Sequence, residues 1–106
     1  FNFGPKTESN RTVRDLVNTT FKYWDGKMSA SIKSNSLHES NLLNLSIDKA
    51  YKYLGWYPFW DFNITMEKTI NWYKKVITEE QSPLYSCKHD LKSYQDYILS
   101  IEKLNN

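Results

Sequence analysis

An aromatic turn constrains this chain more than any other sequence feature. The turn runs from Gly55 to Trp60 (GWYPFW) and separates two stretches with helical periodicity, at 47–54 and 64–77. Proline fixes its own backbone φ angle, and four large rings surround Pro58, so the turn is too apolar for a solvated loop. We therefore expect its rings to clamp the two predicted helices together.

A further helix is predicted ahead of this unit. Thr12 is placed as its N-cap, and Asp15, three residues later, completes a variant capping box. Gly26 is placed to end the helix. Apolar or large side chains recur at helical spacing between these limits and predict one buried face: Val13, Leu16, Val17, Phe21 and Trp24.

Capping signals set the expected limits of the remaining helices. Ser46 is expected to cap the helix over 47–54, and Gly55 to end it. Asn63 or Thr65 is expected to cap the helix over 64–77. A last helix is expected to begin at Ser86, and its inward-facing stripe is predicted as follows: Cys87, Leu91, Tyr94, Ile98 and Ile101.

Short strands are predicted between the helices. Phe1–Phe3 and 28–33 alternate large or apolar residues with polar ones, as half-buried strands do, and 42–45 is a second apolar run. With helices and a small sheet together, the sequence predicts an α+β fold: a mainly helical small domain with short strands. Residues 1–106 are expected to form a single domain. The long βαβ alternation of a doubly wound fold is missing.

Composition excludes several classes of protein. The net charge of the 106 residues is only +2, and acidic and basic side chains are interspersed, which argues against nucleic acid as a partner. No apolar run reaches the ~20 residues of a membrane span. The single cysteine, Cys87, excludes an internal disulfide, and no signal peptide is recognisable, so we expect a cytoplasmic location. The start without Met, in a strand-like stretch, suggests a piece of a longer chain.

Few residues have the spacing of catalytic or metal-binding groups. Cys87 and His89 are two candidate ligands, whereas a zinc site needs three or four, so no metal site is expected. The three glycines are too scattered for a phosphate-binding loop. Tyr23 and Lys27 have the i, i+4 spacing of a catalytic pair, but Gly26 is expected to end the helix between them. No catalytic residue is therefore assigned.

The adjacent pair His38 and Glu39 is the most interesting polar feature. An imidazole beside a carboxylate in an exposed loop can hydrogen-bond the hydroxyl groups or the base of a ligand. From the spacing alone, an ordinary polar loop is the favoured interpretation.

A succession of short motifs carries a family resemblance. The motifs are Leu43-x-Leu45, Ser46-x-Asp48-Lys49-Ala50, Leu54-Gly55-Trp56-x-Pro58 and Thr69-x-x-Trp72-Tyr73. In this order they resemble the C-terminal end of extended short-chain dehydrogenase/reductases that act on nucleotide sugars. Finer features are similar to the CDP-glucose 4,6-dehydratases within that family: 1–5 (FNFGP), His38-Glu39, Pro58-x-Trp60 and 87–94.

The resemblance implies a C-terminal substrate-binding lobe that lacks its Rossmann domain. In such enzymes the N-terminal Rossmann domain holds NAD and the catalytic Tyr/Lys pair, so this chain itself is expected to carry no cofactor. The family reaction removes water from carbons 5 and 6 of a nucleotide sugar after temporary oxidation at carbon 4. His38 and Glu39 are the residues expected to contact the ribose or the cytosine of the substrate.

Two alternatives stay open. The chain resembles sibling epimerases and dehydratases for other nucleotide sugars almost as well. A non-enzymatic interaction module with an aromatic surface would explain the composition too. Self-association is expected under either alternative, because a separated lobe exposes apolar surface.

Overall fold

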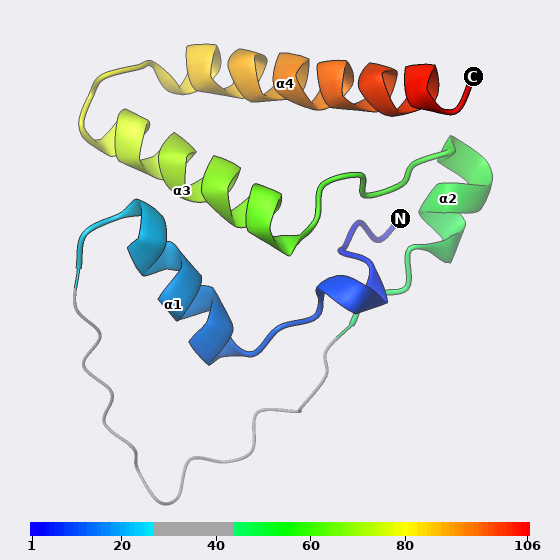
Figure 1. Ribbon diagram of the computed structural model, residues 1–106, viewed down its shortest axis with the longest axis horizontal. Coiled ribbons are helices and arrows are strands. Elements are labelled where there is room, and N and C mark those ends of the chain that lie inside the picture. Colours follow the sequence, from blue (N-terminus) through cyan, green and yellow to red (C-terminus); the bar gives the residue numbers. More distant parts are fainter. Residues whose placement is uncertain (27–43) are drawn as a thin grey trace, which may run out of the picture.

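Helices make up all the regular secondary structure of the part of the chain that the computed structural model describes, residues 1–26 and 44–106 (Figure 1). A short 3-10 helix, η1, spans Thr7–Ser9. Four α-helices follow: α1 at Val13–Tyr23, α2 at Asp48–Leu54, α3 at Phe62–Ile77 and α4 at Pro83–Leu104.

Helix α3 is the centre of the arrangement. Helices α1 and α4 both pack on it, and α4 runs back along it after a short turn (Figure 1). Lys68 of α3 donates a hydrogen bond from its Nζ to the hydroxyl of Ser93 on α4, over 2.9 Å. The side chains buried in this layer are small or flexible: Thr19 of α1, Met66 of α3 and Ser86 of α4.

The α+β prediction is wrong for the described residues, which contain helices and no strand. Phe1–Phe3 lies in irregular structure, because a strand exists only where a neighbouring strand pairs with it; Phe3 instead packs edge-on against the ring of Trp56, with centroids 5.0 Å apart. The predicted strand at 28–33 lies outside the described residues. Of 42–45, only Asn44 and Leu45 are described, and both are in a loop.

The expectation that the aromatic turn clamps α2 onto α3 is also wrong. Helix α2 lies apart from the layer formed by α1, α3 and α4 (Figure 1). It is attached to the N-terminal segment instead: a Cβ atom on Gly4 would lie 3.3 Å from the Cβ of Leu45 and 3.8 Å from Ile47, and the Nζ of Lys49 lies over the ring of Phe1. Single rings of the turn do reach each helix, Tyr57 meeting Tyr51 of α2 and Trp60 lying under Lys68 of α3, but they do not bring α2 and α3 together.

Two helix limits agree with the prediction from sequence. The capping box of Thr12 and Asp15 is present at α1, and Gly55 ends α2 with φ of 63°. Other caps differ from the prediction. Asp61 caps α3 through a 2.9 Å bond to the amide of Ile64, where Asn63 or Thr65 was expected.

Three further features of the helix ends differ. Ser82 caps α4, so that helix begins at Pro83, whose missing N–H costs nothing in a first turn, rather than at Ser86. Helix α1 ends at Tyr23, before Gly26, and no side chain caps α2, where Ser46 was expected.

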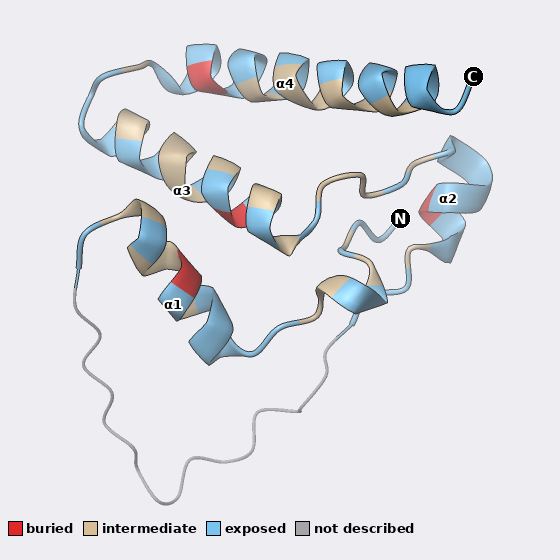
Figure 2. Ribbon diagram, in the orientation of Figure 1, coloured by how far each residue is buried: buried red, intermediate tan, exposed pale blue. Residues whose placement is uncertain are grey.

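Little of the apolar surface is enclosed (Figure 2). Among the described residues, Ala50 and Met66 are the buried apolar side chains, and no large side chain is fully buried. Cys87 and Leu91 were predicted to be inward-facing, but both are exposed; Tyr94, Ile98 and Ile101 of the same stripe are half-buried. The described residues thus form an open layer of helices without a closed core.

Candidate functional site

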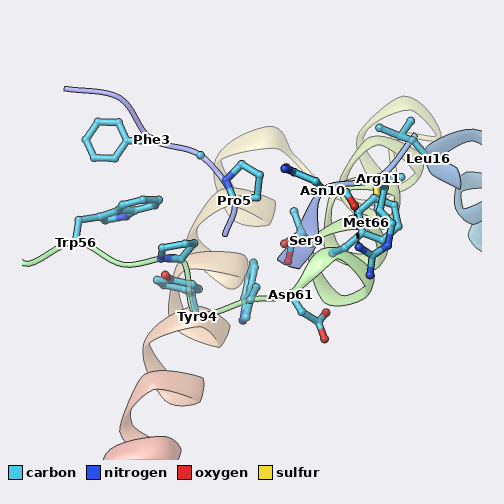
Figure 3. Close-up of a pocket in the computed structure, with 15 residues that line it drawn as sticks. Phe3, Pro5, Ser9, Asn10, Arg11, Leu16, Trp56, Asp61, Met66 and Tyr94 are labelled. Atoms are coloured by element: carbon cyan, nitrogen blue, oxygen red, sulfur yellow. Dashed lines mark hydrogen bonds between the residues drawn. The ribbon is translucent and has the colours of Figure 1, made fainter. Parts of the chain in front are cut away.

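An aromatic groove of about 640 Å³ is present in the described structure (Figure 3). One wall is the N-terminal segment with η1, and the other is the aromatic turn with the start of α3. Its volume is in the range of small-molecule sites. The lining residues are Phe3, Gly4, Pro5, Ser9, Asn10, Arg11, Leu16, Trp56, Pro58, Trp60, Asp61, Phe62, Thr65, Met66 and Tyr94.

Tyr94 of α4 fixes the shape of the aromatic turn. Its hydroxyl donates to the carbonyl of Tyr57 over 2.9 Å and accepts from the amide of Phe59 over 3.2 Å. Its ring meets Trp60 edge-on, with centroids 4.9 Å apart, and also meets Phe59 at 6.2 Å. One side chain therefore holds the turn around Pro58 against α4 and sets the floor of the groove.

Arg11 is the one cationic side chain of the groove lining. Its Nη1 donates to the carbonyls of Glu8 and Asn10, over 2.9 and 2.8 Å. The guanidinium lies over the ring of Phe62, 5.3 Å from the centroid. Arg11 thus joins η1 to the start of α3, and these contacts already engage its charge.

The acidic group of the lining has a structural role as well. The Asp61 carboxylate accepts the amide of Ile64 and caps α3. The helix macrodipole also favours a negative charge at this helix start. Most of the groove surface is left to rings and aliphatic groups, so the groove is suited to an apolar occupant.

No catalytic constellation is found in the described ranges. They hold no cluster of three or more His, Cys, Asp and Glu side chains that could bind a metal ion. His89 Nδ1 lies 3.5 Å from the Asp90 carboxylate on the outer part of α4, and its ring stacks on Tyr85. Cys87 is exposed.

The predicted substrate-binding residues, His38 and Glu39, lie outside the described residues. Their contact with a nucleotide therefore stays a prediction. The aromatic groove itself was not anticipated, because its two walls are separated by about fifty residues in the sequence, and no spacing rule brings Phe3 to Trp56. The aromatic richness of 56–60 was the one signal that pointed to it.

One comparison with known proteins gives a result. The chain is 32% identical over 95 residues to a CDP-glucose 4,6-dehydratase of Salmonella typhimurium, and the match covers 89% of this chain. It spans only 26% of that enzyme, so the chain is similar to about a quarter of its relative. No family model matches the chain, and no solved structure matches it.

None of the described helices has both the length and the apolar character needed to cross a membrane.

Proposed function

We propose that this chain is the C-terminal, substrate-side region of an NAD-dependent CDP-glucose 4,6-dehydratase. One observation carries the proposal: the 32% identity to such an enzyme over nearly the whole of this chain. The motif succession from Leu43 to Tyr73 supports it. Under this proposal NAD and the catalytic groups belong to the rest of the polypeptide, and the product is the CDP-4-keto-6-deoxy sugar.

We assign His38 and Glu39 to the nucleotide end of the substrate. This pair is one of the features in which the chain resembles the family, and it carries an imidazole and a carboxylate. The imidazole can donate or accept a hydrogen bond, and the carboxylate accepts from ribose hydroxyls or from the amino group of cytosine.

Turnover tests the proposal directly. The longer polypeptide encoded by the same reading frame, incubated with CDP-glucose and NAD, should form the 4-keto-6-deoxy product, whereas this 106-residue chain alone should not. Product from the chain alone would contradict its assignment as a non-catalytic part. Turnover by the longer protein of a different nucleotide sugar, with none of CDP-glucose, would favour a sibling enzyme.

Substitutions in the longer protein test the assigned residues. His38→Ala and Glu39→Gln should raise KM for CDP-glucose about tenfold or more, since each removes a hydrogen bond to a polar ligand. His89→Ala is the matched control, because His89 is exposed on α4 and is assigned no contact with the substrate. An unchanged KM in both test variants would remove the site assignment and leave the reaction class standing.

A further inference from the structure

Three polar side chains of the aromatic groove are engaged within the chain. Arg11 donates to two carbonyls, Asp61 caps α3, and the Tyr94 hydroxyl makes two hydrogen bonds. A polar small molecule that used these three side chains would have to replace hydrogen bonds that they already make. The rings and aliphatic groups that remain favour side chains of a polypeptide as the occupant.

Apolar surface continues beyond the groove. Leu16, at its edge, is 46% exposed, and Phe3, in its wall, is 52% exposed. Further along α1, Val13 is 64% exposed. Exposed apolar surface that is continuous over several residues marks an interaction site in a soluble protein.

The position of the N-terminus indicates which polypeptide can reach the groove. Phe3, Gly4 and Pro5 form one wall, so chain joined ahead of Phe1 starts at the rim (Figures 1 and 3). About three-quarters of the Salmonella enzyme has no counterpart in this chain. Covalent attachment gives such a segment a high effective concentration at the groove.

We propose that the aromatic groove binds an apolar helix or strand from the part of the longer polypeptide that precedes Phe1. This inference rests on the proposed function, which makes the chain one region of a larger enzyme. The groove between the N-terminal segment and the aromatic turn is then the surface where that region joins the rest of the protein. Trp56, Trp60 and Leu16 are the central contacts.

Hydroxyl-radical footprinting with mass spectrometry tests the proposal on two proteins, the 106-residue chain and the longer polypeptide. Oxidation of Trp56 and Trp60 should be at least about two-fold slower in the longer protein, because burial excludes the radical. Trp24 and Trp72 are half-buried and do not line the groove, so they are the internal controls and should change little.

Three results would overturn the proposal. Equal oxidation of Trp56 and Trp60 in both proteins would show that nothing covers the groove. Protection that appears in the 106-residue chain as its concentration rises would assign the groove to a second copy. Protection of that chain by added CDP-glucose would assign the groove to a small-molecule ligand.

The outcome is separable from that of the proposed function. Protection of Trp56 and Trp60 in a longer protein that dehydrates no nucleotide sugar would support the docking surface and contradict the function. Dehydration of CDP-glucose without protection of Trp56 and Trp60 would support the function and contradict the docking surface. A reading frame that supplies no polypeptide ahead of Phe1 would contradict both.

Discussion

At the scale of single residues, Tyr94 has the most connections in the described structure. Its hydroxyl joins two backbone groups of the aromatic turn, and its ring contacts two aromatic neighbours. The sequence placed Tyr94 on the inward stripe of the last helix, which is correct, but gave no sign of its hydrogen bonds. Those bonds link residues more than thirty positions apart, and only the folded chain brings them together.

Tyr94→Phe should lower the free energy of unfolding by about 1–2 kcal/mol, because it removes both hydrogen bonds and leaves the Tyr57 carbonyl and the Phe59 amide without that partner. Urea denaturation followed by circular dichroism measures the change. Tyr97→Phe is the control, since the Tyr97 hydroxyl makes no hydrogen bond within the described structure. Equal effects of the two substitutions would contradict the role of the hydroxyl.

Asp15 should make the stability of α1 depend on pH. The Thr12 amide donates to its carboxylate over 3.0 Å and the Thr12 hydroxyl over 2.9 Å, and these bonds, helped by Arg11 and Arg14, hold the pKa of Asp15 below its ordinary value. The ionised carboxylate therefore stabilises the helix above the pKa of the unfolded chain. That stabilisation is lost as the pH falls through the lower pKa of the folded state.

An acid titration followed by circular dichroism at helix wavelengths measures this effect. The native chain should lose part of its helix signal below the ordinary carboxyl pKa. Asp15→Asn should start from a lower signal at neutral pH and should lack that component. Identical titration curves for the two proteins would argue against the capping box as the cause.

At the scale of elements, the caps show how far sequence determines helix limits. Gly55 and the pair Thr12 and Asp15 act locally, and the sequence predicted them correctly. Asp61 and Ser82 are equally local, yet several polar residues lie near the start of each helix, and propensity alone does not choose among neighbours within one turn. The predicted packing of α2 against α3 was wrong because long-range contacts set where α2 lies. Gly4 approaches Leu45, and no periodicity in the sequence encodes that contact.

Two left-handed positions allow a paired test of helix ends. Gly55, after α2, has φ of 63°, and Glu79, after α3, has φ of 59°. Gly55→Ala should destabilise the chain by about 1 kcal/mol, because a Cβ atom is strained in this conformation. A Cβ there would have no neighbour within 4 Å, so backbone strain is the whole effect.

Glu79→Gly should have the opposite sign and stabilise the chain slightly, because glycine relieves the same strain. Thermal unfolding of the two variants beside the native chain measures both effects. The same sign of change for both substitutions would contradict the assignment of left-handed caps.

At the scale of the whole molecule, the described residues expose more apolar surface than a finished domain does. On α4, Leu84, Leu91 and Leu99 are each more than half exposed. The sequence predicted the amphipathic pattern of this helix, but a pattern does not say what covers it. The predicted site, His38 with Glu39, was named from the sequence and lies outside the described residues, so it stays a prediction. The groove could not be predicted, because it depends on tertiary contacts.

The isolated 106-residue chain should self-associate through this surface. Sedimentation velocity should show a mass that grows with concentration, and Leu91→Glu should reduce the growth because it places a charge on the exposed face of α4. Leu104→Glu is the control, since Leu104 is at the last turn and 86% exposed. Association that neither substitution changes would place the contact elsewhere.

Scanning calorimetry of the 106-residue chain tests most directly whether its core is completed by polypeptide outside it. Because no large side chain is fully buried in the described structure, the chain alone should unfold in a broad transition. Its enthalpy should be well below the about 0.7 kcal/mol per residue that closed domains show near 60 °C. A single sharp transition with that full enthalpy, in a sample that stays monomeric, would contradict the central claim.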